Sequence, residues 1–159
     1  MEKISLMGAD LLLKSLDEIE NGTAVLVPQD ESLVTKCKML KKEQAVIDFN
    51  TPAQNIVNFV RGMAEWPVAY THYNGVMLKI YKAKSHTLQN FMVLSNISLD
   101  KISNMKNGQV ALVSTKKGIF VKCDNSVLEL VELQLEGGKK MSAKDFSNGK
   151  KLATGAILN

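Results

Sequence analysis

The strongest constraint on the fold is an Asn74-Gly75 pair that stands between two runs of alternating apolar and polar residues. An Asn-Gly pair in this setting predicts a β-hairpin with a type I′ turn, because that turn needs positive φ at both central positions. A two-residue loop also fixes how the strands pair. The predicted pairs across the hairpin are Tyr73 with Val76, Thr71 with Leu78, and Ala69 with Ile80. These residues share one face of the sheet, which can be buried.

The opposite face of the predicted hairpin is aromatic and basic. It carries Val68, Tyr70, His72, Met77, Lys79 and Tyr81. On the pattern alone, an ordinary hairpin with amphipathic outer residues is the favoured interpretation, and a face that meets a ligand is the alternative.

The charge balance is compatible with an anionic partner but does not by itself identify one. The 159 residues carry a net charge of +4, and 45% of them are hydrophobic, which suits one globular domain or one domain with an arm. Of the 20 basic residues, only Arg61 is an arginine. Lysine acts as a point charge, so this composition suits contacts to phosphate groups better than bidentate reading of bases.

Several classes of protein do not fit the sequence. No apolar run approaches the ~20 residues that span a membrane, and no signal peptide is visible, so we expect a cytoplasmic protein with no membrane partner. Cys37 and Cys123 are far apart and are expected to be plain thiols. His72 and His86 lack neighbours at ligand spacing, so no metal site is expected. A P-loop, a Gly-x-Gly-x-x-Gly motif and a nucleophile elbow are also missing, so we expect neither a catalytic residue nor a bound cofactor in this chain.

The chain divides into three parts. Residues 1–22 have the apolar spacing of a helix, which Asn21-Gly22 ends, and the broad apolar stripe of this helix needs a cover. That cover could be a second copy, so self-association through the N-terminal helix is possible. Residues 23–50 are expected to be a basic linker, and residues 51–159 a separate domain.

Residues 51–159 predict several short strands. Helices are expected over 51–63 and 142–149, a helical turn over 98–105, and strands over 91–94, 109–115, 119–123 and 127–135 in addition to the hairpin. The apolar pattern slips by one residue along 127–135, which predicts a bulge that helps a sheet to curl. The predicted fold is mainly β with helices: a small antiparallel OB-like barrel preceded by an N-terminal helix and a linker.

Basic and aromatic residues in three places are candidates for contacts to nucleic acid. They are Lys41 and Lys42 in the linker, Tyr70, Lys79 and Tyr81 on the outer hairpin face, and Lys139 and Lys140 in a late loop. Taken singly, each lysine is equally well explained as solvated surface charge. Taken together, they predict a basic track of the kind that follows a phosphate backbone.

Four segments resemble the C-terminal part of the methionyl-tRNA formyltransferase family. They are LMGADLLLKSLDEIENG, similar to the last helix of its catalytic domain; VPQDESLVTKCKMLKKEQAVIDF, similar to its linker; NIVNFVRGMAEWPVAY with LKIYKA, similar to the entry of its C-terminal domain; and LELVELQLEGGKKMSAKDFSNG, similar to its late strand, basic loop and short helix. Two places depart from the family. The chain has Glu65-Trp66-Pro67-Val68 where Pro-Trp-Pro-Gly is common, and Gly138 where the first lysine of a Gly-Lys-Lys run is common.

The resemblance implies a chain that is inactive alone. The family transfers a formyl group from its co-substrate, 10-formyltetrahydrofolate, to the amino group of initiator methionyl-tRNA. Its catalytic residues lie in a Rossmann-like domain that precedes the helix at residues 1–22, and no residue here matches them. The implied partners are therefore tRNA and the missing catalytic domain, and the implied role is tRNA binding by an OB-like domain during translation initiation.

Two other functions remain open from the sequence. The chain could be a free-standing OB-like nucleic-acid-binding protein, although such a module has no need for a broad apolar stripe on its first helix. It could also be the C-terminal domain of a sugar-nucleotide formyltransferase relative, which the many lysines make less favoured than a tRNA-binding role.

Overall fold

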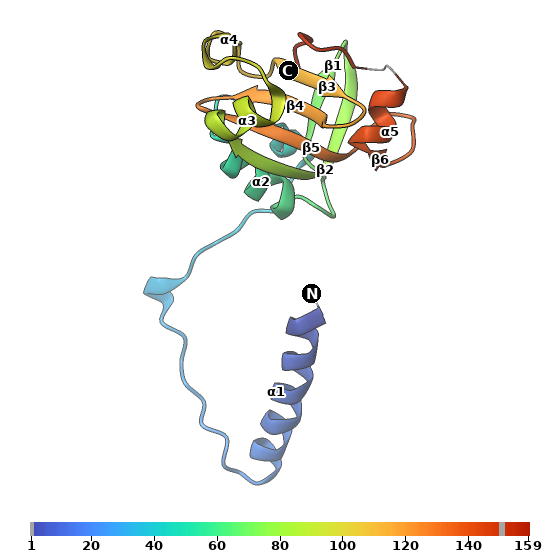
Figure 1. Cartoon of the computed structure of the whole chain (residues 1–159). Helices are drawn as coiled ribbons and strands as arrows, with labels where there is room; N and C mark the ends of the chain where they lie inside the picture. Colours follow the sequence, from blue (N-terminus) through green and yellow to red (C-terminus); the bar gives the residue numbers. More distant parts are fainter. Residues whose placement is uncertain (1, 150–151) are drawn as a thin grey trace. The chain divides into compact units, whose positions relative to one another are not determined.

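The computed structural model describes residues 2–149 and 152–159, which form two compact units. The first unit is Met1–Lys38 and the second is Met39–Asn159. The first unit contains the helix α1, Glu2–Glu20, and a short 3-10 helix, Glu31–Leu33 (Figure 1). The predicted N-terminal helix is thus confirmed.

Helix α1 presents its apolar residues to solvent. Leu11, Leu12 and Leu16 are 64%, 60% and 52% exposed, respectively. The helix ends where the sequence predicted, because Gly22 adopts a φ of +66° and the N–H groups that follow return to the last turn. Within the described residues, no helix combines the length and the hydropathy that crossing a membrane requires.

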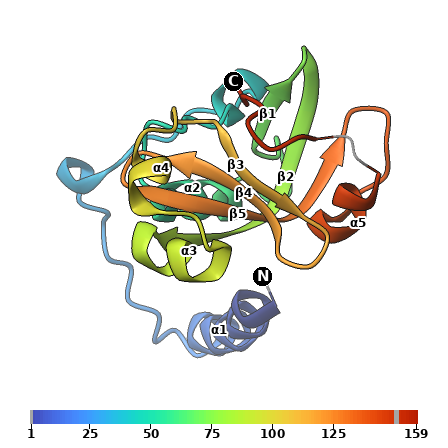
Figure 2. The ribbon, with the colours of Figure 1, turned by 45° about the horizontal axis from the view of Figure 1, so that its top comes forward.

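The second unit is built on an antiparallel sheet with the strand order β1-β2-β5-β4-β3, and β6 pairs with β5. The strands are β1 Tyr70–Tyr73, β2 Val76–Thr87, β3 Val110–Ser114, β4 Gly118–Cys123, β5 Ser126–Leu135 and β6 Met141–Ser142. The helices are α2 Ala53–Gly62, α3 Leu88–Ser95, α4 Leu99–Ser103 and α5 Ala143–Asn148, with a short 3-10 helix at Lys42–Ala45. Figure 2 shows the curvature of this sheet and the helices around it. The predicted class, a small antiparallel sheet of barrel type with helices, is confirmed.

The predicted hairpin is present with the predicted register. Asn74 and Gly75 have φ values of 51° and 77°, as a type I′ turn requires. Thr71 pairs with Leu78 and Tyr73 with Val76, and the Ile80 N–H donates to the Ala69 carbonyl at 2.8 Å. Immediately before the hairpin, the Trp66-Pro67 peptide bond is cis and Val68 has a φ of 63°. That left-handed conformation favours glycine, the residue that the resembled family commonly has at this position.

The long strands β2 and β5 carry two bulges. The register passes from Ile80–Leu133 to Lys82–Glu132 and then to Ala83–Leu130, which leaves Tyr81 and Val131 as the extra residues. The bulge at Val131 confirms the slip predicted within 127–135. Together the two bulges allow Leu133 and Leu130 to point into the same core, where both are buried.

The last residues of the chain connect the two edge strands, β1 and β3. The Leu158 N–H donates to the Gly108 carbonyl at 2.9 Å, next to β3, and Leu158 itself is only 2% exposed. Asn159 exchanges two backbone hydrogen bonds with His72 of β1, at 2.7 and 3.1 Å (Figure 1). The tail therefore spans the gap that the sheet leaves open.

Part of the segment expected as linker packs into this unit. Ala45, Ile47 and Phe49 are 0%, 4% and 5% exposed, and Val46 bridges Tyr70 in a parallel pairing. The extended backbone over 45–49 explains the packing, because alternate side chains of such a segment lie on one face, and here Ala45, Ile47 and Phe49 face the core.

The strand expected over 91–94 is wrong. These residues lie in α3, which begins where the Thr87 side chain accepts a hydrogen bond from the Asn90 N–H at 3.1 Å. Phe91 points into a second, small apolar cluster with Ile102 and Phe120. The helical turn expected over 98–105 is confirmed as α4.

Candidate nucleic-acid interface

The outer face of the hairpin carries a pocket of about 190 Å³. It is lined by Lys42, Pro67, Tyr70, Met77, Lys79, Gln134, Glu136 and Gly137. Three of the candidate residues, Lys42, Tyr70 and Lys79, thus meet in one place although they come from two distant parts of the sequence. We call this site the Tyr70 pocket.

Strand pairing positions the side chains of the Tyr70 pocket. Tyr70 lies opposite Lys79 across the hairpin, and Lys79 lies opposite Gln134 of β5. The Tyr70 ring makes a T-shaped contact with the His72 ring, with the centroids 5.5 Å apart and the planes at 89°. This contact restricts the orientation of the tyrosine ring.

Two lysines of the pocket keep their charge uncompensated. Within residues 2–149 and 152–159, neither Lys42 nor Lys79 has a carboxylate within 4 Å. Glu136, which also lines the pocket, is solvent-exposed and forms no ion pair with them. The pocket therefore offers positive charge beside an aromatic ring.

A chain of side-chain contacts holds the loop between β5 and β6 against the sheet. The Tyr81 hydroxyl donates to Gln134 Oε1 at 2.7 Å, and Gln134 Nε2 donates to the Gly138 carbonyl at 2.8 Å. Lys140 Nζ lies 4.5 Å from the centroid of the Tyr81 ring and 2.8 Å from a carboxylate oxygen of Glu132. Tyr81 and Lys140 thus contact each other, and the charge of Lys140 is compensated.

The two remaining candidates, Lys41 and Lys139, have exposed side chains. Lys139 follows the pocket residue Gly137 by two positions and has no carboxylate within 4 Å in the described part of the chain. Lys41 precedes the pocket residue Lys42, and its backbone N–H donates to Gln44 Oε1 at 2.8 Å. Within the described residues neither lysine forms an ion pair, so both carry an uncompensated ammonium group close in sequence to the Tyr70 pocket.

Sequence reasoning missed Gln134, which links the pocket to the loop. The sequence pattern could have identified Gln134, because the slip predicted within 127–135 places this residue on the same outer face as Lys79. Lys82 was also missed. The bulge at Tyr81 changes the alternation along β2, and Lys82 is exposed directly after the candidate residue Tyr81.

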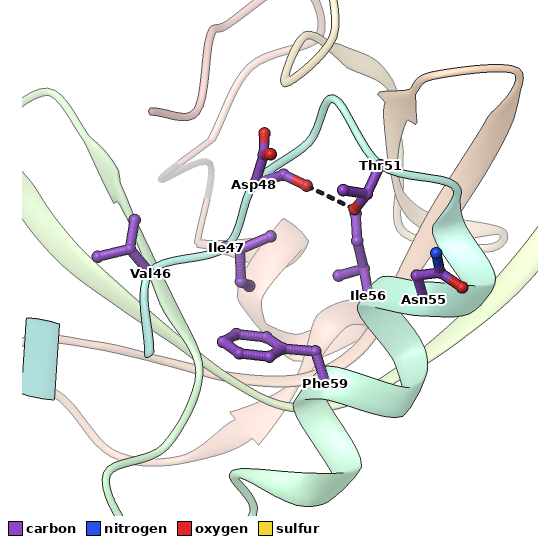
Figure 3. Close-up of a pocket in the computed structure, with 7 residues that line it drawn as sticks. All are labelled: Val46, Ile47, Asp48, Thr51, Asn55, Ile56 and Phe59. Atoms are coloured by element: carbon purple, nitrogen blue, oxygen red, sulfur yellow. Dashed lines mark hydrogen bonds between the residues drawn. The ribbon is translucent and has the colours of Figure 1, made fainter. Parts of the chain in front are cut away.

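A second pocket of the same unit is apolar. Figure 3 shows it between residues 46–48 and α2, with a volume of about 240 Å³. Its lining residues are Val46, Ile47, Asp48, Thr51, Asn55, Ile56 and Phe59. None of the candidate residues is among them, and the only charged side chain is that of Asp48, so this pocket does not suit a phosphate group.

Two titratable groups, the Cys123 thiol and the Lys122 ammonium group, lie in the interior away from the Tyr70 pocket. Burial raises the pKa of the Cys123 thiol to about 12. Burial also lowers the pKa of Lys122, whose ammonium group donates to the carbonyls of Cys123 and Asp124. No cluster of three or more His, Cys, Asp or Glu side chains with the geometry of a metal site occurs in residues 2–149 and 152–159.

Residues 39–151 match the family described as formyl transferase, C-terminal domain. This chain belongs to that family. The match begins where the second compact unit begins, and it confirms the predicted resemblance to the C-terminal part of methionyl-tRNA formyltransferase.

Relatives of this formyl transferase domain extend the likeness to the whole chain. The methionyl-tRNA formyltransferases of Lachnospira eligens and Geobacter metallireducens are each 38% identical to it over 157 residues. Those matches cover 99% of this chain but 47% and 45% of the relatives. The chain therefore spans somewhat less than half the length of the curated relatives it matches.

Solved structures share the fold of this formyl transferase domain. A variant of HypX from Aquifex aeolicus has a TM-score of 0.61 with 14% identity, covering 91% of this chain and 24% of HypX. HypX in complex with tetrahydrofolic acid has a TM-score of 0.59, also with 14% identity, covering 86% of this chain and 22% of HypX. At this identity the likeness concerns the fold alone.

Proposed function

We propose that this chain is the tRNA-binding C-terminal portion of a methionyl-tRNA formyltransferase. The observation that carries the proposal is a group of lysines at and beside the Tyr70 pocket, Lys42, Lys79 and Lys139, that have no compensating carboxylate among the residues the structure describes. Uncompensated lysines at and beside one pocket suit the phosphate backbone of RNA. The names of the relatives give tRNA as the nucleic acid.

In this proposal, formyl transfer takes place outside the chain. The whole enzyme would take the formyl group from 10-formyltetrahydrofolate in the cytoplasm and transfer it to initiator methionyl-tRNA, and this portion would hold the tRNA. The exposed stripe of α1, with Leu11, Leu12 and Leu16, would pack against the rest of the enzyme, because a stripe of this kind is unfavourable in water. Self-association through α1 is the alternative cover.

The test measures tRNA binding by the chain at several salt concentrations. The wild-type chain should bind weakly, and log K should fall linearly with log salt. Lys42→Ala, Lys79→Ala and Lys139→Ala should each weaken binding and flatten the slope by about one unit, the effect of one lost phosphate contact. Lys101→Ala, on the exposed surface of α4, is the matched control and should change neither quantity.

A wild-type slope near zero, or equal effects of the control and the three variants, would remove the candidate residues from any RNA-binding surface. The same preparation tests the second half of the proposal. The chain alone should form no formyl-methionyl-tRNA from methionyl-tRNA and 10-formyltetrahydrofolate, and turnover above an enzyme-free control would contradict the assignment of chemistry to residues outside it.

A further inference from the structure

The Tyr70 pocket differs from a plain phosphate-binding surface. One part of its lining is apolar or aromatic, with Pro67, Tyr70 and Met77, and another part is polar, with Gln134 and Glu136. A phosphate group gains nothing from an apolar wall and is repelled by a carboxylate. The lining therefore suits a flat, partly apolar group that also donates hydrogen bonds.

We propose that the Tyr70 pocket binds a single unstacked nucleobase of the RNA. The inference rests on the proposed function and adds to it a site for a base instead of a phosphate. RNA-binding proteins commonly stack unpaired bases on aromatic side chains and contact the edges of those bases through hydrogen bonds. Such a site would direct the chain to a single-stranded loop or end of its RNA.

The volume of the pocket limits what can enter. Pockets for drug-sized ligands measure about 300 to 1,000 Å³, whereas the Tyr70 pocket measures about 190 Å³. A volume of this size suits a group smaller than a drug-sized ligand, such as one planar ring system. The phosphate attached to the bound base would remain outside and meet the ammonium groups of Lys42 and Lys79.

The polar side of the pocket is oriented before any base arrives. Gln134 Oε1 already accepts from the Tyr81 hydroxyl, and one Nε2 hydrogen of Gln134 is already donated to the Gly138 carbonyl. An amide nitrogen carries two hydrogens, so one donor of Gln134 is left for a base. The carboxylate of Glu136 supplies an acceptor, which favours a base edge with an amino group or a ring N–H.

The ring of Tyr70 is the stacking surface in this proposal, and substitutions of Tyr70 test it. Tyr70→Ala in the full chain should weaken binding of a single-stranded hexanucleotide by at least about tenfold. Tyr70→Phe keeps the ring and should remain within about twofold of wild type. The salt dependence separates stacking from charge, because Tyr70→Ala should leave the slope of log K against log salt unchanged while Lys79→Ala flattens it.

The unmodified chain provides a second measurement that does not depend on folding of a variant. The Met77 methyl signal in an NMR spectrum should shift when the hexanucleotide is added, because Met77 lines the pocket. The Met92 methyl signal is the control, since Met92 packs against the separate cluster that contains Phe91. A duplex of the same sequence should shift the Met77 signal much less, because its bases are stacked.

The outcomes distinguish this inference from the proposed function. If the lysine variants weaken binding but Tyr70→Ala binds like wild type, or if the Met77 signal does not move, the nucleobase site is overturned and the tRNA-binding role stands. If wild-type chain binds no RNA at any salt concentration, both are overturned.

Discussion

Gly108 should tolerate substitution least among the residues that join β3 to the C-terminal tail. It has a φ of +81°, and a Cβ atom added there would lie 2.5 Å from the Leu158 carbonyl oxygen. Real Cβ atoms essentially never approach so closely, so Gly108→Ala must displace backbone and not just a flexible side chain. The backbone that it displaces is the tail that spans β1 and β3.

The cost follows from the contacts that the tail would lose. A non-glycine residue in a left-handed conformation costs about 1–2 kcal/mol. Exposing Leu158, which is 2% exposed, costs about 1.5–3 kcal/mol, and the hydrogen bond from its N–H to Gly108 adds about 1 kcal/mol. Gly108→Ala should therefore lower the free energy of unfolding by about 3.5 to 6 kcal/mol, a large part of the 5–15 kcal/mol that is usual for a domain.

Urea denaturation of wild type and variant, followed by circular dichroism, measures this loss. Gly62→Ala is the matched control, because Gly62 ends α2 with nothing within 4 Å of an added Cβ, and it should be neutral or stabilising by up to about 1 kcal/mol. Leu158→Ala should destabilise by about 2–5 kcal/mol, and the double variant should cost less than the sum because both changes release the same tail. A Gly108→Ala chain as stable as wild type would refute the closure of the sheet by the tail.

Three further predictions concern the hairpin, the loop and the thiols. Gly75→Val should cost about 1–3 kcal/mol in thermal or urea unfolding; since an added Cβ would meet no atom within 4 Å, the loss comes from the positive φ alone. In tRNA binding, Lys139→Ala should flatten the salt slope by about one unit and Lys140→Ala by less, because the ammonium group of Lys140 is already ion-paired. At pH 8 a thiol reagent should label exposed Cys37 and leave Cys123 unlabelled until the chain is unfolded. Burial raises the pKa of the Cys123 thiol from 9.0 to about 12, so the thiol ionises at lower pH in the unfolded chain than in the folded one. The free energy of unfolding should therefore be unaffected by this group below pH 9 and should decrease between pH 9 and pH 12. This decrease should be absent in Cys123→Ala.

The hairpin and the bulge in β5 could be predicted because local chemistry determines them. Asn74-Gly75 allows one short turn with one register, and the slip of apolar residues along β5 has a local cause in the bulge at Val131. The pattern of buried residues then follows from period-two alternation, without knowledge of distant contacts.

The errors came from segments whose conformation depends on distant partners. Residues 91–94 are a short apolar run, which fits a buried helix as well as a strand, and the cap at Thr87 that decides the matter is a weak signal. The packing of residues 45–49 against β1 and of Leu158 beside Gly108 needs contacts across most of the unit. Single-sequence periodicity carries no information on such long-range pairs.

The candidate site was predicted in part for the same reasons. Alternation placed Tyr70 and Lys79 on one face, which is a local property of the hairpin. The approach of Lys42 to that face depends on the long-range pairing of Val46 with Tyr70, and the compensation of Lys140 depends on Glu132 in the neighbouring strand. The sequence could therefore identify the candidate lysines. Only the structure shows which of their ammonium groups are ion-paired with a carboxylate and which are not.

The two ends of the second unit meet on the same edge of β1. Val46 pairs with Tyr70 and Asn159 pairs with His72, two residues further along the strand, a spacing on the order of 7 Å. A unit whose entry and exit lie beside the same strand can be circularly permuted: a linker would join residue 159 to the segment that leads into Val46, and the chain would be opened at the Asn74-Gly75 turn. The same geometry lets the unit be appended to, or inserted into, another protein through one small patch while the Tyr70 pocket stays intact.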